Sequence, residues 1–173
     1  KRESIKTLIL TLWKREDEAP TRAEEVALSG AVNAYIRKIS GDRSVRPDFN
    51  GFYEFVSVDY RRMIEEKRVR EKDFDIDGFL NVLEPFYRGG DYDFLLNSDK
   101  ELDLTNKRFI VFELDNIGSN KVLLPVVTLI IMETFIAKMR RLKGVRKMIL
   151  IEECWKALMS ANMSEYIKYL FKT

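Results

Sequence analysis

Residues 148–158 read Met-Ile-Leu-Ile-Glu-Glu-Cys-Trp-Lys-Ala-Leu, and this stretch carries the strongest signal for the fold. Four apolar residues, 148–151, come directly before two acids, Glu152 and Glu153. A short apolar run that ends at a polar turn is typical of a strand buried on both faces of a sheet. We therefore predict a buried β-strand over residues 148–151, with both acids at its carboxyl end.

A second apolar run lies upstream and leads into a long apolar helix. Residues 108–114, Arg-Phe-Ile-Val-Phe-Glu-Leu, predict another buried strand. Residues 121–142 predict a helix, with Pro125 near its first turn, where proline is tolerated. A strand, a helix and a strand joined by short links form a βαβ unit, which requires a parallel sheet. The predicted fold class is therefore α/β.

The first part of the chain has helical periodicity instead. Thr21 and Glu24 are spaced as a capping box, and Asp75 is placed to cap a short helix. We predict two domains: a helical subdomain over residues 1–100 and an α/β part over residues 101–173. The helices expected in the subdomain cover roughly residues 1–16, 21–39, 50–67 and 76–83.

Composition excludes several kinds of chemistry. The 173 residues include no histidine and one cysteine, Cys154. Catalysis by Ser-His or Cys-His pairs, an intramolecular disulfide and a cysteine-based zinc cluster are therefore all excluded. The formal net charge is only +2, which argues against a polybasic protein that wraps nucleic acid. We expect a reduced, cytosolic compartment.

Two acidic pairs fall where ligands bind in open α/β sheets, beyond the carboxyl ends of the strands. Glu152 and Glu153 have the form of a Walker B motif, in which one acid holds Mg²⁺ through water and the next activates the water that attacks the γ-phosphate. Glu113 and Asp115 form a weaker pair. For Glu152 and Glu153 the ordinary alternative is a turn that caps the following helix, and for Glu113 and Asp115 it is loop solvation or helix capping.

Basic residues gather farther along the predicted helix. Residues 138–147 include six cations, at the end of the sheet opposite Glu152. Cations at a helix carboxyl terminus complement the helix dipole, which is the ordinary interpretation. Contact with DNA or with another subunit is the alternative, because phosphate binding requires such a patch.

The segment 148–158 resembles the Walker B segment of the conjugative-transfer ATPases of type IV secretion systems. Together with residues 87–96 and 109–115, it makes the whole chain similar to the TraG proteins of conjugative transposons, most strongly over residues 104–158. The resemblance implies a partial RecA-like P-loop core with a large helical insertion. It places Glu152 at Mg²⁺, in contact through a water molecule, where the family usually has Asp. It makes Glu153 the catalytic carboxylate.

The resemblance also implies cofactors and partners. The cofactors are ATP and Mg²⁺, and the partners are further copies of the same ATPase, such as a hexamer, and the proteins of the conjugation or secretion channel. DNA contact is a further expectation. The expected location is cytoplasmic and peripheral, at the inner face of the bacterial inner membrane.

One motif of the family does not occur in these residues. No G-x-x-x-x-G-K-[ST] sequence is present, so we expect the phosphate-binding loop to lie upstream in a longer parent protein. Two other functions fit the sequence: a non-catalytic helical protein-interaction module, and a P-loop motor for DNA replication or packaging.

We predict that these 173 residues alone bind ATP weakly and do not hydrolyse it, because no lysine-bearing loop cradles the phosphates. Calorimetric titration with ATP and Mg²⁺, followed by a phosphate-release assay, checks this. Robust turnover by the isolated chain would contradict it.

Overall fold

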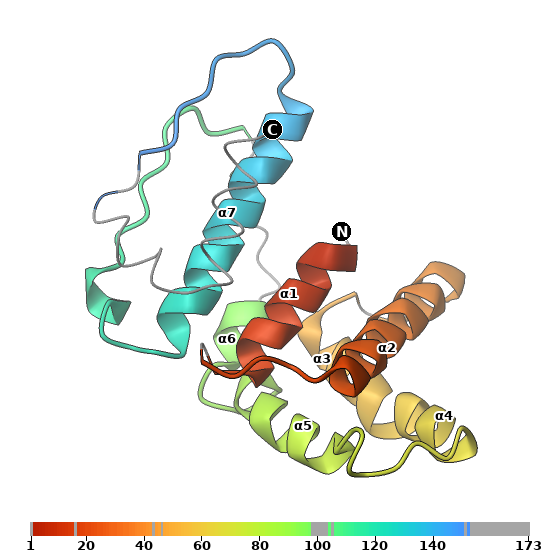
Figure 1. Ribbon diagram of the computed structural model, residues 1–173. Coiled ribbons are helices and arrows are strands. Elements are labelled where there is room, and N and C mark those ends of the chain that lie inside the picture. Colours follow the sequence, from red (N-terminus) through yellow and green to blue (C-terminus); the bar gives the residue numbers. More distant parts are fainter. Residues whose placement is uncertain are drawn as a thin grey trace. The chain divides into compact units, whose positions relative to one another are not determined.

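The computed structural model describes residues 2–15, 17–42, 44–45, 47–97, 104, 106–150 and 152. The chain divides into two compact units, residues 1–101 and 102–173 (Figure 1). Each unit is described by itself below.

Unit 1 is built of helices and tight turns. Thr21 caps α2 as the sequence predicts: its hydroxyl accepts from the Glu24 amide at 3.3 Å, and its own amide donates to the Glu24 carboxylate at 2.7 Å. Asp75 caps α5 by accepting from the Gly78 amide at 2.9 Å. The elements are α1 (Arg2–Trp13), α2 (Arg22–Gly41), α3 (Phe49–Phe55), η1 (Val56–Tyr60), α4 (Arg61–Glu66), α5 (Ile76–Leu83), η2 (Glu84–Phe86) and α6 (Asp93–Leu96).

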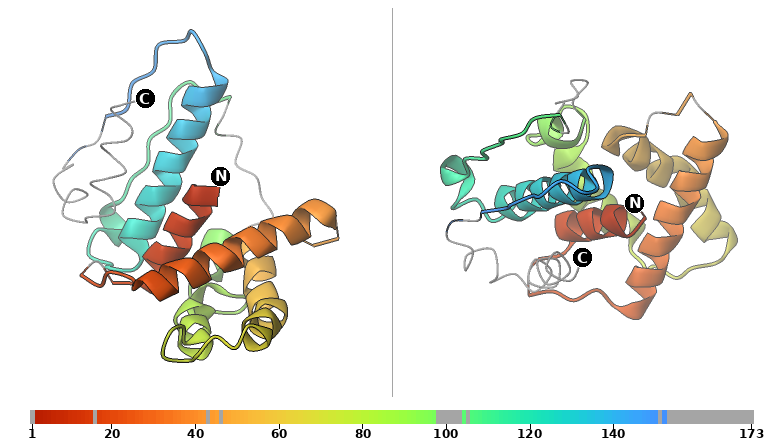
Figure 2. Two further views of the ribbon diagram at one scale, coloured as in Figure 1. Left: turned by 45° about the vertical axis from the view of Figure 1, so that its right-hand side comes forward. Right: turned by 90° about the horizontal axis from the view of Figure 1, so that it is seen from above.

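Aromatic side chains fill much of the core of unit 1. Helix α1 contacts both α2 and α5, and Figure 2 shows these helices from two sides. Trp13 meets Phe79 edge to face, with ring centroids 4.8 Å apart, and meets Phe74 in the same way at 5.8 Å. Each such aromatic pair contributes about 0.5–1.5 kcal/mol of stability, in addition to the contribution from burying its apolar surface. The aromatic cluster therefore fixes α1 against the segment that leads into α5.

The long helical segment 49–66 is not a uniform α-helix. Its middle part, η1, is a π-helix, which the sequence analysis did not predict. Tyr60 ends this π-helix, is almost fully buried, and donates from its hydroxyl to the Ala27 carbonyl in α2 at 2.7 Å. A Cβ at Gly30 would lie 2.7 Å from the same hydroxyl, so only glycine leaves room for it. Helix α2 and η1 can therefore pack closely at this point.

In the part of unit 2 that the structure describes, the chain forms one long helix and one short turn. The turn is η3 (Asp115–Ile117), and the helix is α7 (Leu123–Arg141). The Asn120 side chain accepts from the amides of Val122 and Leu123, each at 2.9 Å, and so satisfies donors at the start of the helix. One face of α7 is buried, through Val126, Thr128, Leu129, Met132 and Ile136.

The predicted parallel sheet is wrong for the part of the chain that the structure describes. Residues 108–114 and 148–150 contain no β-strand, and no backbone hydrogen bond joins these two segments. None of their apolar side chains is buried, and several are largely exposed: Phe109 is 85% exposed, Met148 87% and Leu150 79%. A strand is stable only when a neighbour takes up its backbone donors and acceptors. The α/β, RecA-like fold class is therefore replaced by a helical one.

A lysine side chain joins α7 to the segment that precedes residue 108. Lys138 of α7 donates from Nζ to the carbonyl of Leu104 at 2.8 Å and also to the carbonyl of Lys107. The segment before residue 108 is thus held to the carboxyl-terminal end of α7 by a side chain. None of the helices within the described ranges is long and apolar enough to cross a membrane.

Replacing Tyr60 with phenylalanine should lower the free energy of unfolding by about 1–2 kcal/mol, because the Ala27 carbonyl keeps its helix partner but loses a buried donor. Urea unfolding of the chain, followed by far-ultraviolet circular dichroism, measures the change. Tyr53→Phe is the matched control, since no hydrogen bond of the Tyr53 hydroxyl occurs in the described structure. Equal stability of the two variants would contradict the role given to the Tyr60 hydroxyl.

Candidate functional site

The structure describes only one of the two proposed catalytic acids. Glu152 lies in a turn and is exposed, and no salt bridge engages it in the described part of the chain. Glu153 lies outside the described residues, as do Cys154 and Trp155. Within the residues described, no group of three or more acidic or cysteine side chains is placed to hold a metal ion. The geometry therefore leaves Glu152 free to receive a ligand but does not build a complete site around it.

The weaker acidic pair is also exposed. Glu113 lies at the end of the extended segment, and Asp115 is the first residue of η3. The Asp115 carbonyl accepts from the Gly118 amide at 3.3 Å within this turn. Asp115 therefore belongs to a solvated turn, which is the ordinary interpretation of this pair.

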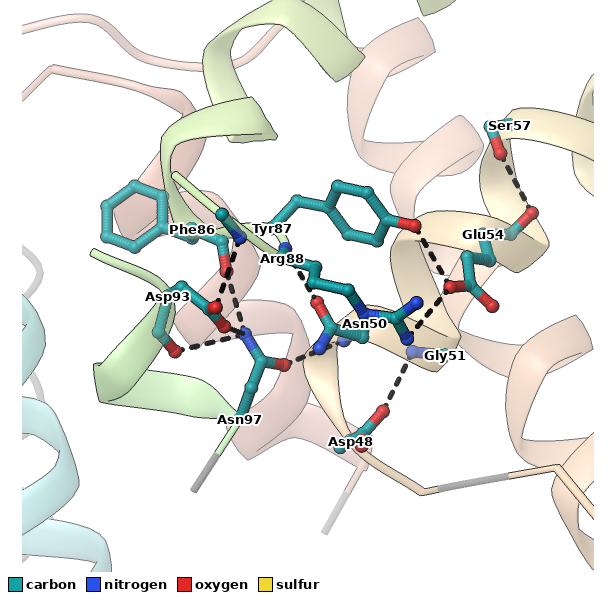
Figure 3. A network of polar contacts seen from close by, with 11 residues as sticks. Asp48, Asn50, Gly51, Glu54, Ser57, Phe86, Tyr87, Arg88, Asp93 and Asn97 are labelled. Carbon is teal, nitrogen blue, oxygen red and sulfur yellow. Dashed lines mark hydrogen bonds and ion pairs between the residues drawn. The ribbon is translucent and has the colours of Figure 1, made fainter. Parts of the chain in front are cut away.

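The best-defined polar arrangement lies in unit 1, where Asn97 joins two segments (Figure 3). Its Oδ1 accepts from the Asn50 amide at 2.9 Å, while its Nδ2 donates to the Phe86 carbonyl at 2.9 Å. The same Nδ2 donates to the backbone carbonyl of Asp93 at 3.1 Å and to its carboxylate at 2.9 Å. A single amide side chain thus ties the start of α3 to both ends of the segment 86–97.

Further contacts join Tyr87 and Arg88 to side chains of α3 (Figure 3). The Arg88 amide donates to the Asn50 side chain at 3.0 Å, and the Tyr87 hydroxyl donates to Glu54 at 3.0 Å. The hydrogen bond to Glu54, followed by partial burial, raises the pKa of the Tyr87 phenol. The Tyr87 ring also stacks on Tyr53, with centroids 4.4 Å apart. The phenol therefore stays protonated near neutral pH. Its hydroxyl donates the hydrogen bond that joins Tyr87 to Glu54 of α3.

An open groove of about 470 Å³ lies beside this network. Lys38 and Asp59 pair across it, and Arg88 reaches Glu54 at 3.5 Å at one end. Tyr35 donates at 3.0 Å to the carbonyl of Asp48, which lines the groove, and burial raises the pKa of Tyr35 to about 12. Because its main charges pair with each other, the groove has no evident general base or nucleophile.

Sequence reasoning did not find this network. Asn50 and Asn97 are 47 residues apart, and neither belongs to a motif whose spacing implies contact. The run Tyr87-Arg88-Gly89-Gly90, which contributed to the family resemblance, contains three residues of the network, Tyr87, Arg88 and Gly89. Gly89 has φ of +82°, a conformation that favours glycine, and its amide donates to the Asp93 carboxylate at 3.1 Å.

Comparison with known proteins identifies the family. The model of the TraG P-loop domain matches residues 1–173, so the chain belongs to the TraG P-loop domain family. This membership places it among P-loop proteins, the class of domain that binds nucleotides, generally with Mg²⁺. No curated protein and no solved structure shows significant similarity to it.

Replacing Asn97 with alanine should lower the free energy of unfolding by about 2–3 kcal/mol, because the Phe86 carbonyl and the Asn50 amide lose their partner in a half-buried place. Urea unfolding measures the loss, and hydrogen exchange should show faster exchange at residues 86–97. Asn81→Ala is the matched control, since Asn81 is exposed in the middle of α5 and makes no described hydrogen bond. A loss no larger than that of the control would contradict the role of the network.

Proposed function

We propose that the chain is part of an ATP-hydrolysing motor that energises conjugative DNA transfer or type IV secretion. The observation that carries this proposal is the match of the TraG P-loop domain family over the full 173 residues. A P-loop domain binds a nucleotide, and a motor converts its hydrolysis into movement. The specific role in conjugation is supported by the similarity of residues 87–96 and 148–158 to the conjugative-transfer ATPases.

In this proposal Glu152 helps to hold Mg²⁺ through water. Magnesium in phosphate-binding sites usually keeps several waters and takes one or two protein carboxylates together with phosphate oxygens. An exposed carboxylate with no described salt bridge, as Glu152 is, suits such a role. Glutamate in place of the usual aspartate lengthens the side chain by one methylene.

Glu153 is proposed as the group that orients and deprotonates the attacking water. When bound, Mg²⁺ supplies positive charge that stabilises the phosphoryl group during transfer. The backbone cradle and the lysine for the phosphates are absent from these 173 residues and must come from other residues of the protein. The acids alone therefore supply one half of a nucleotide site.

The same proposal includes partners and a location. We propose that the motor acts as a homo-oligomer, together with channel proteins, at the inner face of the bacterial inner membrane. Glu152 lies in unit 2, so unit 1, with its own aromatic core, is available for contacts with those partners.

A second candidate function is a helical protein-interaction module without catalysis. The observation that favours it is the organisation of unit 1, in which helices with their own caps and core border an open groove. In this case Glu152 and Glu153 would form an ordinary capped turn.

The test is ATP turnover by a longer chain in which a phosphate-binding loop accompanies these residues. Glu153→Gln should reduce the turnover number by at least about a hundredfold, since a positioned general base contributes roughly 10²–10⁴. ATP binding should be retained, because the amide keeps the size of the carboxylate. Phosphate release and calorimetric titration measure the two quantities.

Glu71→Gln serves as the matched control, because Glu71 is an exposed glutamate of unit 1 with no described salt bridge. It should leave both turnover and binding unchanged. Equal turnover in the wild type and in Glu153→Gln, or no nucleotide binding by either, would reject the motor and favour the interaction module.

A further inference from the structure

Beyond the end of α7 the chain makes a turn that is rich in cations. We call residues 141–148, Arg-Leu-Lys-Gly-Val-Arg-Lys-Met, the basic turn. The helix ends where the Leu142 amide donates to the Lys138 carbonyl at 2.9 Å. Gly144 follows with φ of +75° and has no heavy atom within 4 Å of the place where a Cβ would lie. The turn therefore has open space on its outer side.

The cations of the basic turn are free for an external partner. Arg141, Lys143, Arg146 and Lys147 are all exposed, and no salt bridge or hydrogen bond of their side chains occurs within the described ranges. Lys138, one turn earlier, differs because it donates to two backbone carbonyls. No acidic residue occurs between Glu133 and Glu152 to neutralise the turn. A concentrated positive charge of this kind attracts anionic partners.

The side chains between the cations indicate which anionic partner fits. Val145 is 57% exposed and Met148 is 87% exposed, and no aromatic residue occurs between residues 136 and 150. Proteins that bind single-stranded nucleic acid combine cations with aromatic side chains on which bases stack. Surfaces that lie on membranes combine Lys and Arg with apolar side chains that enter the headgroup region. The basic turn has the second composition.

We propose that the basic turn binds the surface of a membrane that contains anionic phospholipids. Arg141, Lys143, Arg146 and Lys147 contact the headgroup phosphates, and Val145 and Met148 enter the boundary between headgroups and acyl chains. This inference rests on the membrane location in the proposed function and names the surface responsible for it. It does not depend on ATP hydrolysis, so failure of the turnover experiment would leave it testable.

The experiment measures co-sedimentation of the 173-residue chain with vesicles, in the absence of nucleotide. Vesicles of phosphatidylcholine with phosphatidylglycerol are compared with vesicles of phosphatidylcholine alone. Arg146→Gln combined with Lys147→Gln should weaken binding to the anionic vesicles by about 25-fold, because each cation near such a surface contributes roughly fivefold. Binding should also weaken as salt is added, since screening shortens the range of these charges.

The matched control is Arg62→Gln combined with Lys67→Gln, which removes the same two charges from exposed positions of unit 1. It should bind as the wild type does. Val145→Ser combined with Met148→Ser should weaken binding to anionic vesicles even at high salt, because it removes the apolar contact. If a variant loses helical circular dichroism, Arg141→Gln with Lys143→Gln provides a second test of the charges.

Three results would overturn the proposal. One is equal binding to both kinds of vesicle. Another is equal weakening by the basic-turn pair and the control pair. The third is tighter binding to a duplex DNA oligonucleotide than to anionic vesicles, with no effect of the Val145 and Met148 changes, which would assign the turn to nucleic acid.

Discussion

The close approach of α2 to the segment 49–66 is the constraint on which unit 1 depends. Gly30 leaves space for the Tyr60 ring, and the Tyr60 hydroxyl finds its acceptor at the Ala27 carbonyl. Burying a phenol without a partner costs free energy, so this hydrogen bond permits the burial. From this contact α3 extends towards Asn97 on one side and α4 continues on the other. The polar network and the groove therefore depend on it for their geometry.

The sequence predicts those parts of the fold that local chemistry determines. The capping box at Thr21, the cap at Asp75 and the long helix that became α7 all follow from nearby residues, and the structure confirms them. The strands at 108–114 and 148–151 depend instead on neighbours that local sequence does not supply. Apolar residues such as Phe109 and Leu150 predict burial only if something covers them, and in the described structure they are exposed. The apolar pattern of a segment does not show whether a neighbouring strand is present to cover it.

The candidate site also contains residues that the sequence identifies and residues that it does not. Glu152 could be selected from sequence because two acids after an apolar run form a recognisable pattern, and the structure shows its carboxylate exposed. The role of Glu153 stays a prediction. Asn97 could not be selected, because an asparagine has no distinctive spacing and its partners come from segments far apart in the chain. Family membership then narrows the function beyond what these side chains could establish.

The π-helix of residues 56–60 has a consequence for how unit 1 tolerates changes of length. A π-helical turn holds one residue more than an α-helical turn, and such bulges occur mostly as single inserted residues. Successive residues of an α-helix are separated by about 100° around its axis. Within a regular α-helix, deleting one residue would rotate everything after it by about that angle. The wide turn over Val56–Tyr60 can instead lose one residue by becoming a regular helical turn. Ile64 would then stay on the buried face that it occupies now. In this segment the wide turn, and not the number of residues alone, therefore sets which face of α4 meets the core.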